Sequence, residues 1–183
     1  GLAWQGCSGR GFRWTEGVGV EMLENLGNGN NRASAIAADG SIMGGFAQGN
    51  FNRTPALWQP DLTGDVYGMD FIGEIYGFSE DGSIILGNLS GDAFFQTEDD
   101  GGTFIGSLNP GWEGIPQGVT EDGTTIVGYD VLQLSRQAWV WTQGGGIQSL
   151  NALMTSLGVS DLPNFQVCRG VTEDGNVIVG CYV

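Results

Sequence analysis

The chain has 183 residues and a formal net charge of −15, and 34 of its residues are glycine, about 19% against a usual share of roughly 7%. It contains six arginines but neither lysine nor histidine, which excludes the common histidine-based nucleophile and metal sites and lysine Schiff-base chemistry. The acidic charge argues against nucleic acid or an anionic lipid surface as a partner, and no apolar run approaches the roughly 18 residues of a membrane-spanning helix.

The opening residues 1–6 read as a stray strand of a preceding or closing sheet. The sequence opens at Gly1 rather than at Met, and it does not open with a positively charged segment followed by an apolar one. We therefore expect a processed chain or a fragment of a longer one. Cys7 follows with no evident partner, so the sequence leaves its pairing open.

From residue 7 onward one pattern repeats four times, and each copy is marked by an Asp-Gly pair. The pairs are Asp39-Gly40, Asp81-Gly82, Asp122-Gly123 and Asp174-Gly175. A glycine lies six residues after every one of these aspartates. Asp-Gly between apolar runs predicts a two-residue type I′ hairpin, in which both turn residues have positive φ.

Upstream of each pair lies an apolar stretch with an aromatic anchor, and a second short apolar stretch follows it. The anchors are Gly11–Trp14, Ala56–Trp58, Ala93–Phe95 and Ala138–Trp141. Each copy thus holds about four strands in about 42 residues, with approximate boundaries 7–45, 46–87, 88–128 and 129–183. This size predicts an all-β protein, a β-propeller or propeller arc of four blade-like repeats. A parallel β-helix would need a shorter repeat.

The space between blades is expected to be filled by four of the tryptophans, Trp14, Trp58, Trp139 and Trp141.

The repeat resembles that of the HAF-type repeat proteins, a family of bacterial secreted and surface proteins. The family's unit is similar to Ala-Phe-x-Trp, then Gly-Gly and Leu-Gly-x-Leu, then Ala-x-Gly-Val-Ser-x-Asp-Gly. The last copy is similar to its long terminal repeat over Trp141-Thr142, Gly144–Gly146, Leu150–Leu153 and Gly170–Gly180, whereas Gln96 replaces the third anchor tryptophan. The resemblance covers nearly the whole chain from Gly11 and implies an extracellular, propeller-like array with no agreed activity.

The third copy contains the densest acidic segment of the chain, Glu98, Asp99 and Asp100 before two glycines. Calcium prefers several oxygen ligands gathered in this way. The spacing is not that of an EF-hand loop, so an exposed acidic turn is the competing interpretation. Calcium is the one cofactor that the sequence nominates.

Further contact candidates lie beside the turns and between two prolines. Glu80, Glu121 and Glu173 each precede a turn aspartate and would share one rim, where solvation is the simpler role. Trp112 lies outside the repeat pattern, between Pro110 and Pro116. It is the best candidate for an exposed contact residue.

Two cysteines flank the last hairpin. With a two-residue turn at Asp174-Gly175, Cys168 and Cys181 are directly opposite at a non-hydrogen-bonded position, where α-carbons lie roughly 4.5 Å apart. This geometry predicts a disulfide and an oxidising compartment. The alternative is two buried thiols, because a β-bulge would shift the register.

The sequence therefore predicts a non-catalytic scaffold or docking subunit for a protein partner or larger assembly, extracellular, on the cell surface or in the periplasm. Four blades are few for a ring, and the end blades of an arc would need further chain or a second copy. The alternative is a carbohydrate-binding or carboxylate-dependent carbohydrate-active protein, with calcium as an aid.

Overall fold

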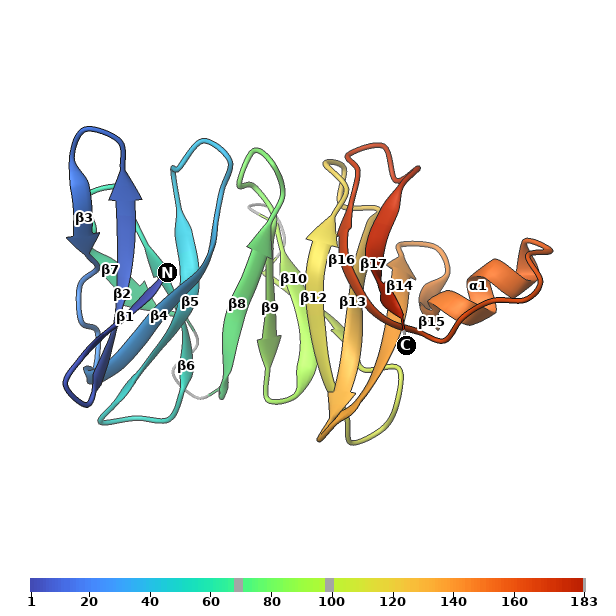
Figure 1. The fold of residues 1–183 in the computed structure, drawn as a ribbon, viewed down its shortest axis with the longest axis horizontal. Helices are drawn as coiled ribbons and strands as arrows, with labels where there is room; N and C mark the ends of the chain where they lie inside the picture. Colours follow the sequence, from blue (N-terminus) through green and yellow to red (C-terminus); the bar gives the residue numbers. More distant parts are fainter. Residues whose placement is uncertain (68–70, 98–100, 183) are drawn as a thin grey trace.

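The structure is a computed structural model that describes residues 1–67, 71–97 and 101–182. Within these ranges the chain forms five antiparallel sheets that stand side by side (Figure 1). Strands that are neighbours in a sheet are consecutive in sequence. The all-β prediction is confirmed, and three of the five sheets have the four strands expected of each repeat.

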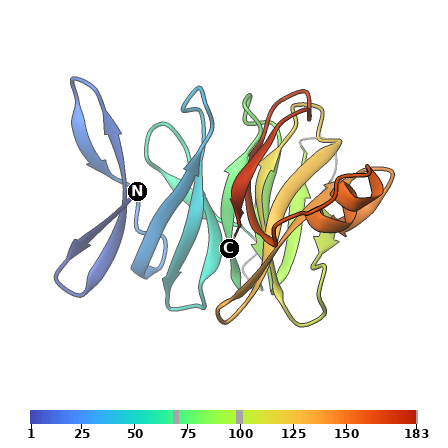
Figure 2. The ribbon, with the colours of Figure 1, turned by 45° about the vertical axis from the view of Figure 1, so that its right-hand side comes forward.

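The elements follow in chain order. The first sheet contains β1 (Leu2–Gln5), β2 (Ser8–Thr15) and β3 (Gly19–Met22). The second contains β4 (Asn28–Ile36), β5 (Met43–Gly49), β6 (Thr54–Trp58) and β7 (Gly64–Val66). The third contains β8 (Gly73–Phe78), β9 (Ile85–Leu89), β10 (Asp92–Gln96) and β11 (Thr103–Gly106). The fourth contains β12 (Glu113–Val119), β13 (Thr125–Leu132), β14 (Ser135–Thr142) and β15 (Gly146–Ser149). The helix α1 (Leu150–Ser156) leads to the fifth sheet, β16 (Phe165–Val171) and β17 (Ile178–Tyr182), and lies at one end of the arc (Figure 2).

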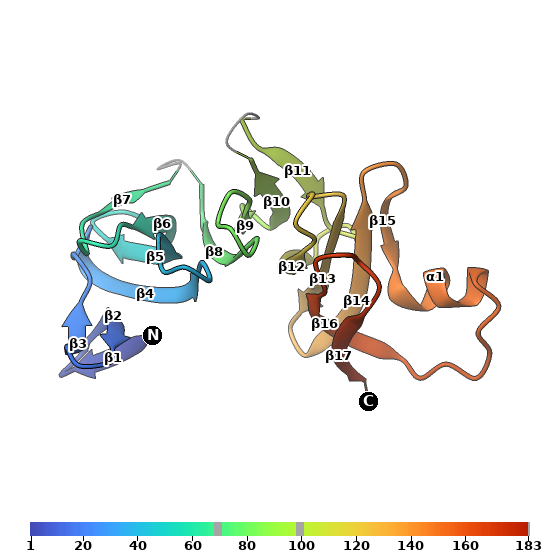
Figure 3. The same cartoon turned by 90° about the horizontal axis from the view of Figure 1, so that it is seen from above.

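The predicted sequence repeats and the observed sheets begin and end at different residues. A complete sheet begins with the Asp-Gly hairpin of one copy and continues with the aromatic anchor of the next, as where β5 pairs with β6. The predicted boundaries after residues 45, 87 and 128 therefore fall inside the second strand of a sheet. Seen from above, the first strands β4, β8, β12 and β16 lie on the inner side of the arc, and β7, β11 and β15 lie outside (Figure 3).

The core lies between neighbouring sheets. Trp58 packs with Leu23 and Met43 between the first and second sheets, and Trp139 packs with Leu86 between the third and fourth. Both tryptophans are fully buried, which confirms their predicted role. For Trp14 that prediction is wrong, because its side chain is 62% exposed on the three-stranded first sheet.

The four Asp-Gly hairpins form, but not with the predicted turn. The four glycines have φ between 69° and 76°, whereas the four aspartates do not have positive φ. In the last hairpin the Thr172 N–H donates to the Val177 carbonyl, which leaves a four-residue loop. The type I′ prediction is wrong because the Asp174 carboxylate accepts the N–H of Asn176 (3.0 Å), a local bond that a two-residue turn does not offer.

A β-bulge interrupts each inner strand five residues before the turn aspartate. The four unpaired residues are Ser34, Tyr76, Gln117 and Arg169. A bulge re-aims side chains and increases the local twist. It also explains the recurrent glycine six residues after the aspartate, because a Cβ at Gly45 would overlap the carbonyl oxygen of Arg32 on the bulged strand.

The last bulge overturns the predicted disulfide. It shifts the register by one residue, so that Cys168 lies opposite Gly180 and Cys181 lies opposite Val167. Both cysteines are free thiols, as is Cys7. The two are not a buried pair either, because Cys181 is exposed while burial raises the pKa of Cys168 to about 11.

Candidate functional site

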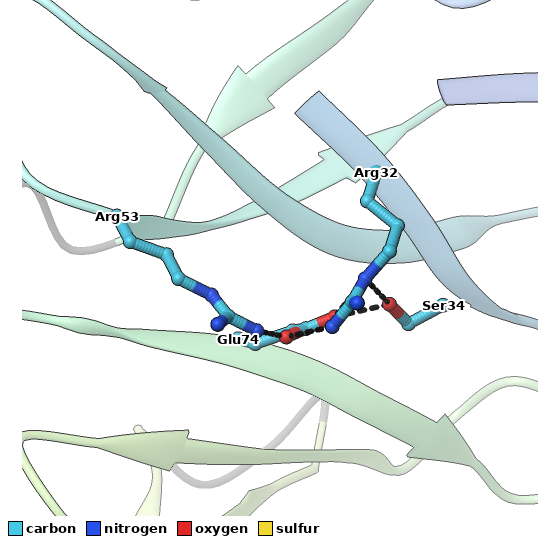
Figure 4. Close-up of polar contacts among 4 residues, drawn as sticks. All are labelled: Arg32, Ser34, Arg53 and Glu74. Carbon is cyan, nitrogen blue, oxygen red and sulfur yellow. Dashed lines mark hydrogen bonds and ion pairs between the residues drawn. The ribbon is translucent and has the colours of Figure 1, made fainter. Parts of the chain in front are cut away.

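The most concentrated polar contact joins the second and third sheets on their inner side (Figure 4). Glu74 on β8 has a fully buried side chain, and both of its oxygens accept hydrogen bonds from the Arg32 guanidinium at 2.7 Å. Arg53, which comes before β6, forms an ion pair with the same carboxylate. Ser34, the bulged residue of β4, donates its hydroxyl to it as well.

The Phe46 ring on β5 holds the two arginines in place. The guanidinium carbons of Arg32 and Arg53 lie 5.1 and 4.2 Å from its centroid. Cation–π contacts of this kind strengthen as water is excluded. Burial lowers the pKa of Arg53, but an arginine stays charged at any physiological pH. The result is a rigid Arg-Glu-Arg cluster at the junction of two sheets.

A cleft of about 710 Å³ opens beside this cluster, at the end of the sheets opposite the Asp-Gly hairpins. Arg53, Tyr76, Trp112 and Glu113 are among the residues that line it. Trp112 is half-buried there, in the loop that leads into β12. The residue that the sequence singled out by its irregular position thus lies in the cleft that adjoins the Arg-Glu-Arg cluster.

The loop that carries Trp112 is anchored from the fourth sheet. Asp130 on β13 is fully buried, and its Oδ2 accepts the backbone N–H of Asn109 at 2.7 Å. The Asn109 side-chain amide also donates to Gln137 at 2.9 Å, and the backbone carbonyl of Asn109 accepts the N–H of Trp112 at 3.0 Å. Burial raises the pKa of Asp130. These bonds fix the backbone of the turn that carries Trp112.

The predicted glutamates lie on the opposite rim, at the hairpin tips. A hydrogen bond between the Glu80 and Glu173 side chains raises the pKa of Glu173, and Glu121 reaches Asp81. All three glutamates are exposed. The structure therefore brings these tips together but separates them from Trp112.

The aspartates of the tips have a structural role. The Ser79 hydroxyl and the Ser83 N–H donate to Asp81 and lower its pKa to about 2, and the Thr172 hydroxyl and Asn176 do the same for Asp174. Residues 98–100, the calcium candidates, lie outside the described residues. Elsewhere in the described part of the chain no three acidic or cysteine side chains are grouped closely enough to hold a metal ion.

Sequence reasoning missed the Arg-Glu-Arg cluster and Tyr76. A signal was present in the repeat alignment, because Glu74 occupies the column of Arg32, Ile115 and Val167 and lies in an otherwise apolar stretch. A carboxylate in a buried strand implies a cationic partner. No pattern in the neighbouring sequence identified that partner, because Arg32 is 42 residues away from Glu74.

Among the described residues, no helix combines the length and apolar character required to cross a membrane. No family model matches the sequence, and no curated protein matches it either.

Solved structures do resemble the fold. TolB from Acinetobacter baumannii aligns with a TM-score of 0.55 and 13% identity, over 81% of this chain and 39% of that one. The β-propeller domain of Cps50 (Swd1) from Myceliophteria thermophila aligns with a TM-score of 0.53 and 11% identity, over 96% of this chain and 60% of that one. The chain thus spans less than two thirds of either structure. At these identities the similarity concerns architecture alone, and this chain has the sheet arrangement of a β-propeller.

Proposed function

We propose that this chain is a non-catalytic scaffold or docking unit of β-propeller type, which binds another polypeptide along the open edge of its last sheet. The β-propeller fold is consistent with a role in protein interaction. The resemblance to HAF-type repeats supports a secreted, cell-surface or periplasmic location. The lack of histidine and lysine supports a role without catalysis.

The observation that carries the proposal is the exposure of β17. In the repeat alignment Val179 corresponds to Leu86 and Val127, which are fully buried, yet Val179 is 57% exposed. Tyr182 corresponds to Leu89 and Asp130, which are also buried, yet it is 65% exposed. In the complete sheets these positions are covered by the next sheet, since Leu86 packs with Trp139 of the fourth sheet and Val127 packs with Cys168 of the fifth. Among the described residues the fifth sheet contains β16 and β17, and β17 is its outer strand.

An open strand edge of this kind binds a further strand through its backbone N–H and C=O groups. Exposed apolar side chains then add the area that makes such pairing stable. We take a second copy of this chain as the polypeptide that covers β17, because two copies present the same open edge and can pair through it.

The native mass of the isolated 183-residue chain tests the proposal. We expect a species heavier than the 19.3 kDa of a single chain. Val179→Lys should shift it toward the single-chain mass, because a charge on the open strand opposes pairing. The matched control is Leu134→Lys, at a residue that is 93% exposed in the turn between β13 and β14. A single-chain mass at every concentration, or equal effects of both variants, would contradict docking along β17.

A second candidate function is carbohydrate binding. One observation favours it: Trp112 lines the cleft together with Asp92 and Glu113. An aromatic face beside carboxylates is a suitable surface for a sugar.

A further inference from the structure

We infer that the cleft between Arg53, Tyr76 and Trp112 binds an uncharged saccharide, with Trp112 as the stacking surface. The inference rests on the second candidate function, carbohydrate binding, and assigns that function to this cleft. It is independent of docking along β17, which lies on the fifth sheet.

The cleft contains polar side chains that are free to bind a ligand. Within the described part of the chain, the side chains of Tyr76, Ser90, Asp92 and Glu113 make no hydrogen bond to protein, although all four line the cleft. Asn88, by contrast, is used internally, because its amide donates to the Gly114 carbonyl at 2.8 Å. The free groups include both donors and acceptors, which suits hydroxyl groups that need both.

The charges around the cleft favour a ligand without net charge. The Arg53 guanidinium is already paired with Glu74, and Glu113 interacts electrostatically with both Arg53 and Tyr76. An anionic ligand would compete with two carboxylates for this cation and would also face Asp92. A cationic ligand would face the guanidinium. Hydroxyl groups bind to such a mixed surface without either penalty.

Three of the residues around the cleft are held by contacts within the protein before any ligand binds. Asp130 fixes the loop of Trp112 through Asn109, as described above. The bulge at Tyr76 sets the direction of its side chain, and Glu74 with Phe46 holds Arg53. Preorganised side chains lower the entropic cost of binding. The volume of about 710 Å³ lies in the usual range for small-ligand sites.

The saccharide itself supplies the complementary surfaces. One face of a pyranose ring presents C–H groups and packs against an aromatic ring, while the hydroxyl groups at its edge bind carboxylates, amides and guanidinium groups. Trp112 provides the aromatic ring, and Asp92 and Glu113 provide the acceptors. The structure shows no bond-breaking step, and the inference concerns binding alone.

The test measures binding of the 183-residue chain to an array of neutral and acidic glycans, followed by titration of the best neutral oligosaccharide with tryptophan fluorescence. Trp112→Ala should weaken binding at least tenfold. Trp14→Ala makes the same change at an exposed tryptophan of the first sheet and should leave binding unchanged. Glu113→Gln replaces one acceptor oxygen of an exposed carboxylate with an amide donor and should weaken binding by severalfold, which covers the case that Trp112→Ala impairs folding.

The outcomes separate the site from the wider function. If neutral glycans bind equally well to the Trp112→Ala and Glu113→Gln variants, the site is wrong while carbohydrate binding stands. If only acidic glycans bind, the uncharged chemistry is wrong. If no glycan binds, both the site and the second candidate function are wrong, and docking along β17 still rests on its own measurement of native mass.

Discussion

At the scale of single residues, Glu74 is the carboxylate with the most arginine partners in the described part of the chain. Its carboxylate is fully buried, and two side chains from β4 and one from the loop before β6 converge on it. Removing one partner of a buried ion pair typically costs about 3 to 5 kcal/mol, because the remaining charge stays buried without compensation. Here the arginines are 37% and 39% exposed, so water can solvate part of what remains.

Glu74→Gln should therefore lower the free energy of unfolding by about 3 kcal/mol, the lower end of that range. Urea unfolding followed by circular dichroism measures it. Glu16→Gln is the control, because Glu16 is exposed and has no hydrogen bond or ion pair among the described residues. A loss below about 1 kcal/mol for Glu74→Gln, as expected of a surface pair, would show that the cluster contributes little.

At the scale of elements, the Asp-Gly hairpin is the repeated unit of construction. Its aspartate binds the N–H two residues on, and in three of the four copies a Ser or Thr hydroxyl binds the same carboxylate. The first copy has Ala37 at that position. These bonds favour the ionised carboxylate, which is why the pKa values of Asp81 and Asp174 fall to about 2.

These low pKa values predict that the free energy of unfolding falls as the pH is lowered. A carboxylate whose pKa is lower in the folded state stabilises the fold fully above its unfolded pKa of about 4, and this contribution is lost as the pH falls toward 2. Unfolding curves between pH 5 and pH 2 should show the decline. In the double variant Asp81→Asn with Asp174→Asn the decline should be smaller. Asp92→Asn, at an aspartate without a hydrogen bond in the described residues, should leave it unchanged, and an unchanged decline in the double variant would disprove the assignment.

Gly123 shows why the turn requires glycine. Its φ is 69°, in the left-handed region, and a Cβ there would lie 3.0 Å from Ile84 of the neighbouring hairpin. Gly123→Val should lower the free energy of unfolding by about 1 to 3 kcal/mol through backbone strain. Gly144→Val is the control, since the surroundings of Gly144 are open and its φ is not in that region. Equal melting temperatures of the two variants would contradict this role.

At the scale of the whole molecule, each sheet is stable only through its neighbours. The apolar clusters lie between sheets, so the second, third and fourth sheets are covered on both faces while the first and fifth are not. Exposed Trp4 and Trp14 on the first sheet match exposed Val179 and Tyr182 on the last. The proposed docking along β17 follows from this difference between central and terminal sheets.

The sequence by itself determined the all-β class, the four-stranded repeat, the positions of the hairpins and the burial of Trp58 and Trp139. These follow from turn chemistry and apolar spacing, which act among residues close in the chain. Only the tertiary structure decided that a bulge separates Cys168 from Cys181, that Arg32 and Arg53 meet Glu74, and that Trp112 lines a cleft with Tyr76. The physical reason is that these contacts depend on how one sheet twists and packs against the next, and several of them join residues more than 20 positions apart.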